Sequence, residues 1–210
     1  MSPLPAKFTS RWGGQREAPS YADSVCWHIL LGADPGVRAV VAEARQRLAP
    51  FGGFHMTPER WLHVTVLLAG PAADITPGQR STMLARAGNA LSGIAPVTVT
   101  LGRVFYHQQA IALGVSPAGA LAPLLRAAQA ATREVTGKGG AADDLGTAWI
   151  PHLTICYSTG EQPAAPVITA LGTRLPAREV TISRLTLVVQ NGAEDLWDWR
   201  IAGSVDLPGS

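Results

Sequence analysis

The sequence predicts an α+β fold of two similar lobes, each a small, mostly antiparallel sheet with helices on its outer side, and a cleft between the lobes. A stretch of the form Trp, one or two residues, His, apolar, Thr, apolar occurs twice, at residues 61–66 and 149–155. Each copy is preceded by a strand pattern and a helix pattern, and is followed by a helix pattern and a strand pattern. No Ser/Gly linker separates the halves, so we expect the lobes to share one interface.

The composition limits the functions that this chain can have. Its 210 residues are long enough for one substantial core. The apolar runs, such as residues 64–69, are far too short to cross a bilayer, and the first ten residues carry no apolar signal-peptide core. A net charge of only +2 does not indicate a long basic surface for binding nucleic acid. We therefore expect a cytoplasmic protein, a monomer by default, that binds neither a membrane nor duplex DNA.

The order of expected elements follows from turn and capping signals. Residues 1–23 are rich in Pro, Gly, Ser and charge, and are expected to form an irregular arm. One bilobal domain should then span residues 24–210, with lobes at roughly 24–95 and 96–206. Alternating or continuous apolar runs predict strands at residues 24–31, 62–68, 97–105, 110–115, 150–157, 179–190 and 197–207.

Helices are expected where apolar residues recur at helical spacing behind a start signal. Asp34 followed by Pro35 provides an N-cap and a first-turn proline, and Pro50 ends that helix. Thr76 with Pro77 and Ser116 with Pro117 provide the next two starts. The predicted helices are residues 35–48, 77–92, 117–135 and 164–172.

The repeated stretch carries the candidate chemistry. Alternation at period two places on one strand face His63, Thr65 and Leu67 in the first copy, and His152, Thr154 and Cys156 in the second. An imidazole and a hydroxyl two residues apart can both point at one small anion. Two such strands facing each other would supply two imidazoles and two hydroxyls to one site.

Two histidines flanking one phosphorus atom can act as a general base and a general acid. Their ordinary pKa of about 6.5 allows one to be neutral and the other protonated near neutral pH. Each proton transfer is typically worth about 100- to 10,000-fold in rate. Threonine hydroxyls can donate to the non-bridging phosphate oxygens as charge develops. This arrangement requires neither a metal nor another cofactor.

Three other interpretations compete with this one. A lone histidine on an apolar strand is more often a satisfied core residue, and threonine is common in strands because of its β-branching; the duplication would then be purely structural. A catalytic zinc would need a third ligand, and neither strand carries a carboxylate on the right face. The cleft could also belong to a non-catalytic module that binds a nucleotide or RNA end. Cys26 and Cys156 lie in apolar runs. The sequence leaves a disulfide between them open, and two buried thiols are the expected state.

The segment 58–70, Pro-Glu-Arg-Trp-Leu-His-Val-Thr-Val-Leu-Leu-Ala-Gly, together with Pro-His-Leu-Thr-Ile at 151–155, resembles the 2H phosphoesterase superfamily. Its bacterial 2′-5′ RNA ligase and cyclic phosphodiesterase branch is the most similar. The two His-x-Thr-x motifs that define the family are intact, and the element order matches over roughly residues 24–206.

The resemblance implies a bilobal α+β fold with pseudo-twofold symmetry and metal-free cleavage of 2′,3′-cyclic phosphates or related phosphodiesters of nucleotides or RNA ends. By motif position, His63 and His152 carry over as the acid–base pair, and Thr65 and Thr154 as ligands of the phosphate oxygens. The reverse reaction is 2′-5′ RNA ligation. The sequence does not assign the acid and the base.

Contacts outside the motifs are harder to place. Family members often stack the base on an aromatic ring of the first strand; His28 lies near that position but also fits a partly buried strand residue. Arg103 is a candidate for phosphate or ribose contact. The arm, with Arg11, could cover the cleft or form a tail. Ordinary surface positions are expected for His55, in a loop, and His107, and packing roles for Trp61, Trp149, Trp197 and Trp199.

Overall fold

The structure is a computed structural model that describes residues 4–13, 21–140 and 149–208. Its α-helices are α1 (Pro35–Leu48), α2 (Pro77–Leu91), α3 (Ala122–Thr136) and α4 (Ala164–Leu171). Its strands are β1 (Lys7–Phe8), β2 (Ser24–Leu30), β3 (Phe54–Met56), β4 (His63–Pro71), β5 (Val97–His107), β6 (Ala110–Ser116), β7 (His152–Ser158), β8 (Gln162–Pro163), β9 (Arg174–Ile182), β10 (Arg184–Gln190) and β11 (Trp199–Asp206).

The strands form two antiparallel halves that meet at the repeated motif. The strand order is β11-β10-β2-β4-β7-β6-β5-β9, with β3 beside β7, and every pairing is antiparallel. Strands β4 and β7 join at one pair, Val64 with Leu153. We call the half that ends in β4 the His63 lobe and the half that begins with β7 the His152 lobe. The expected α+β fold of two antiparallel sheets is confirmed, the sheets being continuous through this pair.

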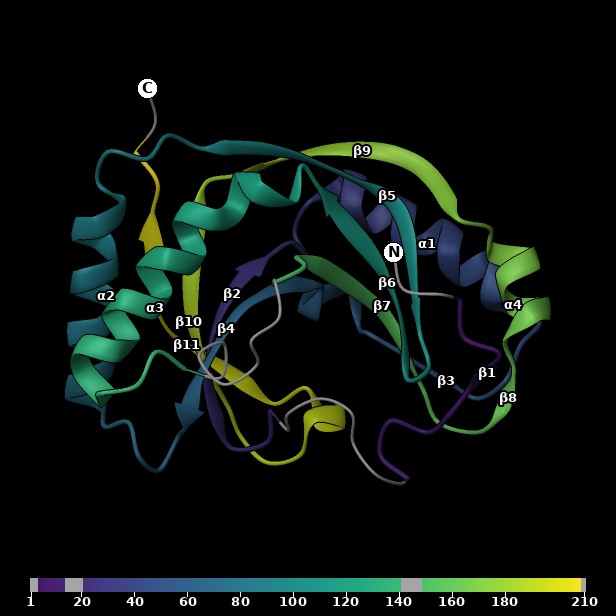
Figure 1. The fold of residues 1–210 in the computed structure, drawn as a ribbon, viewed down its shortest axis with the longest axis horizontal. Coiled ribbons are helices and arrows are strands. Elements are labelled where there is room, and N and C mark those ends of the chain that lie inside the picture. The colour runs from purple at the N-terminus through teal and green to yellow at the C-terminus, as the bar shows by residue number, and fades with distance from the viewer. Residues whose placement is uncertain (1–3, 14–20, 141–148, 209–210) are drawn as a thin grey trace.

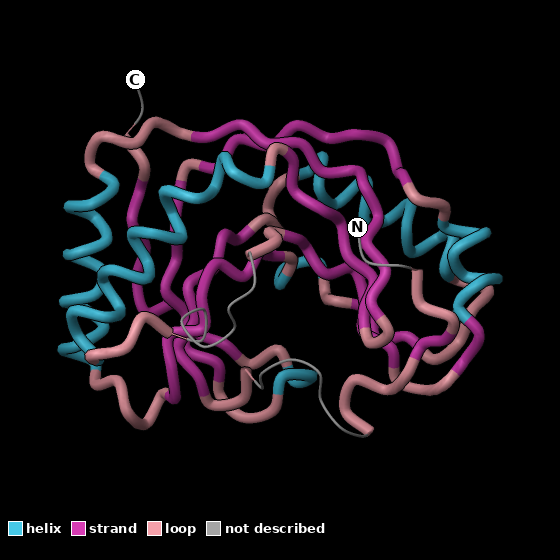
Figure 2. The backbone as a smooth tube through the Cα atoms, viewed as in Figure 1, coloured by secondary structure: helices cyan, strands magenta, loops and turns pink. Residues whose placement is uncertain are grey.

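Helices cover the outer side of each half, as Figures 1 and 2 show. Helices α2 and α3 pack on each other and on β11 and β4, in the His63 lobe. Helix α1 packs on β9, β7 and α4, in the His152 lobe. The buried Trp27 of β2 donates from its indole nitrogen to the Thr132 hydroxyl of α3, at 3.1 Å, which fixes that helix against the sheet.

The first two helix starts follow the predicted signals, whereas the third, expected at Ser116 and Pro117, is wrong: a 3₁₀ turn (Ala118–Leu121) follows Pro117, and α3 begins only at Ala122. Asp34 accepts a hydrogen bond from the Val37 amide at 2.9 Å, with Pro35 in the first turn of α1. Thr76 and Gln79 form a reciprocal capping box at α2. These side chains satisfy amide groups that a helix N-terminus otherwise leaves unpaired.

The lobes differ from the contiguous blocks expected at 24–95 and 96–206. Helix α1 follows a strand of the His63 lobe but packs in the His152 lobe. Helix α3 follows a strand of the His152 lobe but packs in the His63 lobe. The strand expected at 179–190 is two strands: β9 lies at the edge of the His152 lobe, and β10 pairs with β2 in the other. The chain crosses between lobes at Ser183. The apolar pattern continues through this crossing, so the sequence alone does not reveal where β9 ends and β10 begins.

The arm is partly ordered onto the domain. Strand β1 pairs with β8, and Phe8 is fully buried. The Arg11 amide donates to the Ser158 carbonyl at 2.8 Å, so this part of the arm lies along the end of β7. Cys26 and Cys156 are buried free thiols, as predicted. None of the helices in the described part of the chain has the length and apolarity that a membrane span needs.

Candidate active site

The pairing of β4 with β7 brings the four motif side chains together. Val64 lies opposite Leu153, and both side chains are buried in the main core. In an antiparallel pair, the residues on either side of this pair project to the other face. His63 is therefore opposite Thr154, and Thr65 is opposite His152. Each lobe contributes one imidazole and one hydroxyl to a single surface, related by a local twofold through the Val64–Leu153 pair.

Both motif strands carry a β-bulge directly after the threonine. Along β4, Trp27 pairs with Leu67 and His28 with Thr65, which leaves Val66 as the extra residue. Along β7, Ile111 pairs with Cys156 and Ala112 with Thr154, which leaves Ile155 as the extra residue. One extra residue in a strand makes the side chains of the residues after it point to the opposite face of the sheet.

The bulges correct the predicted faces. Leu67 and Cys156 were expected beside the histidines, but both are in the main core. Leu68 packs against the apolar cluster on the cleft side of the His63 lobe, and Tyr157 lines the pocket. Simple period-two alternation across the motif is wrong by one residue at the same position in both copies.

Both catalytic candidates are oriented by the same backbone contact. Nδ1 of His63 lies 2.6 Å from the Trp61 carbonyl oxygen, and Nδ1 of His152 lies 2.8 Å from the Ile150 carbonyl oxygen. A carbonyl only accepts, so Nδ1 carries the proton and donates. In the neutral ring, the lone pair is then on Nε2. Each histidine is set up to exchange a proton through Nε2.

The environments of the two rings differ. His63 is partly buried, with its ring stacked on His28 at 4.2 Å between centroids and packed against the edge of Trp199 at 4.6 Å. Burial lowers the pKa of His63 to about 4, against the raising effect of the Trp61 carbonyl, and the charge of His152 lowers it further. A ring in this setting is strongly biased toward the neutral form.

His152 keeps an exposed edge. The surrounding protein still lowers its pKa from the usual value through desolvation. The Ile150 carbonyl opposes this shift, and the charge of His107 adds to it. The expectation that His107 is an ordinary surface residue therefore omits its electrostatic effect on His152.

A pocket opens beside His63 and is walled mainly by aromatic and polar side chains. Its lining residues are Tyr21, Cys26, His28, His63, Thr65, Tyr157, Gln190, Glu194, Trp197 and Trp199. Trp197 and Trp199 therefore face this pocket, besides packing on each other at 6.5 Å. The His-x-Thr pattern identifies His63 and Thr65 in this set, whereas the others come from strands and turns with no motif of their own.

The structure places His28 in the pocket wall. It is buried, neither ring nitrogen has a hydrogen-bond partner among the described residues, and its pKa is well below the usual value through burial and the neighbouring His63. A neutral, unbonded imidazole here contacts His63 by stacking. Its role in substrate binding stays a prediction.

Arg103 lies on β5 of the His152 lobe, outside this pocket. It is exposed, and its guanidinium carbon is 5.3 Å from the centroid of the Phe105 ring. The structure does not bring Arg103 together with His28: the two lie in different halves of the sheet. His55, expected in a loop, lies on β3, and its Nε2 accepts from the Trp197 indole nitrogen at 2.9 Å.

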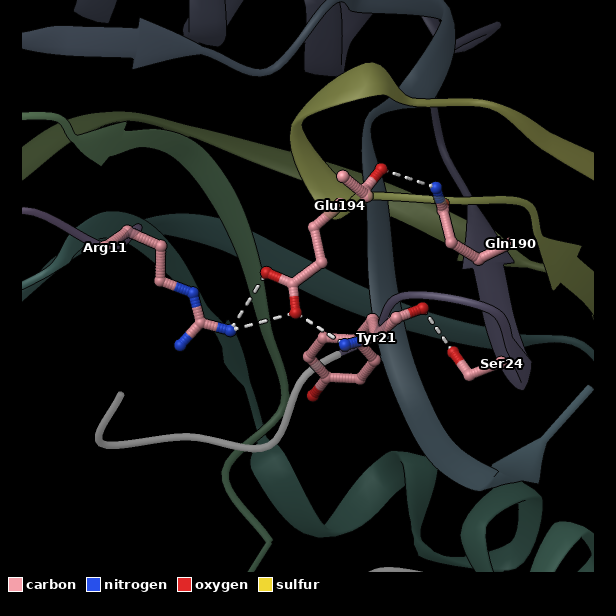
Figure 3. A network of polar contacts seen from close by, with 6 residues as sticks. Arg11, Tyr21, Ser24, Gln190 and Glu194 are labelled. Carbon is pink, nitrogen blue, oxygen red and sulfur yellow. Dashed lines mark hydrogen bonds and ion pairs between the residues drawn. The ribbon is translucent and has the colours of Figure 1, made fainter. Parts of the chain in front are cut away.

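A buried ion pair lies beside the pocket, which its Glu194 lines (Figure 3). The Arg11 guanidinium lies 3.2 Å from a carboxylate oxygen of Glu194, with both side chains almost fully buried. The Tyr21 amide donates to the same carboxylate. Arg11 belongs to the arm along the His152 lobe, and Glu194 to the turn between β10 and β11 of the His63 lobe. The arm thus connects the two lobes.

Tyr157 lies next to this connection. The Arg11 guanidinium carbon is 5.9 Å from its ring centroid. Burial raises the pKa of the Tyr157 hydroxyl, and a side-chain hydrogen bond with Thr154 opposes this shift. The hydroxyl is therefore a neutral donor beside a motif threonine. The sequence pattern did not predict Tyr157 in the site, because only the bulge turns its side chain toward the cleft.

The described His, Cys, Asp and Glu side chains are not grouped as metal ligands. Among the described residues, no group of three or more His, Cys, Asp or Glu side chains is placed to hold one. The two motif histidines instead present separate Nε2 atoms, each with its own backbone anchor.

Comparison with known proteins gives one family. The profile described as the 2′-5′ RNA ligase superfamily matches residues 33–194. A comparison with curated proteins finds no sequence that matches.

Several solved structures share the fold. TT0787 of Thermus thermophilus is 20% identical with a TM-score of 0.67, over 89% of this chain and 99% of that one. E. coli LigT complexed with 3′-AMP is 16% identical with a TM-score of 0.65, over 90% and 99%. The MHV ns2 PDE domain is 15% identical with a TM-score of 0.51, over 76% and 99%. At these identities, the similarity establishes the fold.

Proposed function

The chain belongs to the 2′-5′ RNA ligase superfamily, and from this premise we propose that it is a metal-independent phosphoesterase. Its substrates would be 2′,3′-cyclic phosphates or related phosphodiesters at nucleotide or RNA ends. The observation that carries this proposal is the cross-strand arrangement of His63, Thr154, Thr65 and His152 on one face of the sheet. The binding of 3′-AMP by LigT, which shares the fold, supports a nucleotide ligand.

In hydrolysis, one Nε2 takes a proton from water while the water oxygen bonds to phosphorus. The bond from phosphorus to one ribose oxygen breaks, and the other histidine gives that oxygen its proton. The product is a phosphomonoester. In ligation, the 5′-hydroxyl of a second strand takes the place of water as the nucleophile, and the product is a 2′-5′ linkage.

The asymmetry of the two rings favours one assignment of roles. His63 is stacked in an aromatic wall with a pKa of about 4, so it is neutral and suits the general base. His152 is exposed at one edge, which makes its protonated form easier to solvate. We therefore assign His152 as the general acid in hydrolysis. A bound phosphate anion would raise the pKa of both rings, because negative charge favours the imidazolium.

The threonines would act on the phosphate itself. Each lies opposite the histidine of the other motif, so a phosphate between the two imidazoles is within reach of both hydroxyls. Donors aimed at oxygens that gain charge in the transition state typically contribute about 100- to 1,000-fold in rate. Metal ions are not needed for these steps.

The direct test is hydrolysis of the four 2′,3′-cyclic nucleoside monophosphates, in EDTA, by the wild type and by His63→Ala and His152→Ala. We expect turnover by the wild type, and near-complete loss in both variants. The 2′ or 3′ position of the product phosphate identifies the leaving oxygen.

Two other outcomes would reject the proposal. Activity that appears only when zinc is added would contradict the metal-free mechanism. Nucleotide binding without turnover, on mononucleotides and on RNA ends alike, would favour the binding module.

A further inference from the structure

The face of the sheet that carries His152 continues beyond it across three strands. His152 of β7 pairs with Gly114 of β6, Gly114 pairs with Arg103 of β5, and Arg103 pairs with Arg174 of β9. Directly paired residues project from the same face of a sheet. With strands about 4.8 Å apart, the two arginines leave the backbone at roughly 10 and 14 Å from His152. Both are exposed.

An aromatic ring lies between His152 and these arginines. A Cβ built on Gly114 would come within 2.4 Å of the Phe105 ring, so that ring lies directly over the glycine. Phe105 is only partly buried. Its strand partner is Ala112, which in turn pairs with Thr154. The small residues Gly114 and Ala112 of β6 therefore leave room for the Phe105 ring beside the motif.

The charges on this surface match a nucleic-acid backbone. The Arg103 guanidinium is 5.3 Å from the Phe105 ring centroid, and Arg174 pairs with Arg103 across the strands. Proteins hold single-stranded nucleic acids with this combination of a stacking ring and neighbouring cations.

We propose that Phe105, Arg103 and Arg174 form a subsite for the nucleotide that precedes the terminal, cyclic-phosphate-bearing nucleotide of a single-stranded RNA. The base of that nucleotide stacks on Phe105, and its outer phosphate contacts the two arginines. This subsite rests on the proposed function and extends it, because a free mononucleotide leaves it empty. The site is thereby built for an RNA end of at least two nucleotides.

The test compares two substrates, 2′,3′-cyclic AMP and a tetraribonucleotide that ends in the same cyclic nucleotide. We expect wild-type kcat/KM to be higher for the tetranucleotide. Phe105→Ala should lower the ratio of the two kcat/KM values about tenfold, because base stacking contributes at this level. Phe105→Leu, which keeps an apolar side chain of similar size, should lower the ratio as well and controls for folding.

Arg103→Ala should lower the same ratio severalfold. It should also reduce the slope of log kcat/KM against log salt for the tetranucleotide by about 0.7, the value for one phosphate contact on a single strand. Arg184→Ala is the matched control: this arginine is exposed, pairs with Asp206 and lies in the other lobe. Its ratio and salt slope should equal those of the wild type.

The outcomes separate this subsite from the proposed function. Equal wild-type kcat/KM for both substrates, unchanged by Phe105→Leu and Arg103→Ala, would overturn the subsite and leave the phosphoesterase intact. No turnover of either substrate would overturn the phosphoesterase. In that case, fluorescence anisotropy with a labelled tetranucleotide bearing a 3′-phosphate decides the subsite: unchanged affinity in both variants would reject it, and weaker binding would support it.

Discussion

The His63 and His152 lobes carry the same motif in different surroundings. Each has a histidine anchored through Nδ1 to a carbonyl two residues earlier, a threonine two residues later, and then a bulge. The neighbouring strands differ. Thr65 pairs with His28, whereas Thr154 pairs with Ala112. The short repeat fixes where both imidazoles point, and distant segments decide how readily each one ionises.

The largest effect should come from removing either imidazole. His63→Ala and His152→Ala should each lower kcat by at least about 1,000-fold, because each removes a proton transfer. The double variant should lose little more, since both groups act on one transition state. Steady-state rates on a 2′,3′-cyclic nucleotide check this. Losses that multiply in the double variant would show that the two rings act independently.

Breaking the connection between the lobes should be the next largest effect. Arg11→Ala leaves the buried Glu194 carboxylate without its guanidinium, and loss of one partner of a buried pair costs about 3 kcal/mol of folding free energy or more. Urea unfolding measures it. The control is Lys7→Ala, since the Lys7–Glu161 pair is exposed and such pairs contribute less than about 1 kcal/mol. Equal effects would mean that Arg11 does not stabilise the lobe contact.

Removing one hydroxyl should have a smaller effect on rate. Thr65→Val and Thr154→Val keep the β-branched shape, and each should lower kcat/KM by about 100-fold through loss of a donor to the phosphate. Thr154 is nearly buried and lies beside the Tyr157 hydroxyl, so its loss also leaves that hydroxyl without its partner. A variant with wild-type kcat/KM would exclude the corresponding hydroxyl from the phosphate site.

The pH dependence should reflect the unequal rings. The base must be neutral, so kcat/KM falls as pH drops through the pKa of His63, which is about 4. The acid must be protonated, so kcat/KM falls as pH rises through the pKa of His152, which is lowered from 6.5. We expect a bell-shaped profile with its maximum below about pH 6.5. A maximum above about pH 7 would contradict this assignment.

A subtler change should alter one ring alone. Trp199→Leu removes an aromatic edge from His63 and admits water, so the pKa of His63 should rise toward its ordinary value by about one unit. Histidine proton NMR against pH measures both rings. His152 is the internal control and should titrate as in the wild type. Equal shifts in both rings would show that the wall around His63 is not the cause of their difference.

Much of the fold could be predicted from the sequence because local signals determine where most of its helices and strands lie. Asp34 and Thr76 cap helices at the predicted positions, and the motif strands lie where the apolar runs place them. Two features of the fold could not be predicted from the sequence. The bulges at Val66 and Ile155 have no signature in an apolar run, and the crossing at Ser183 interrupts neither apolarity nor β-propensity. Both are settled by which strands pair.

The candidate site divides in the same way. The repeat alone predicted His63, Thr65, His152 and Thr154 as candidates, because the spacing of side chains along a strand is a local property. Tertiary structure decided that Trp199 and His28 enclose one imidazole, that Arg11 meets Glu194, and that Phe105 lies over Gly114. These contacts join segments far apart in sequence, and their energies depend on burial and charge in the folded chain. No local pattern encodes that environment.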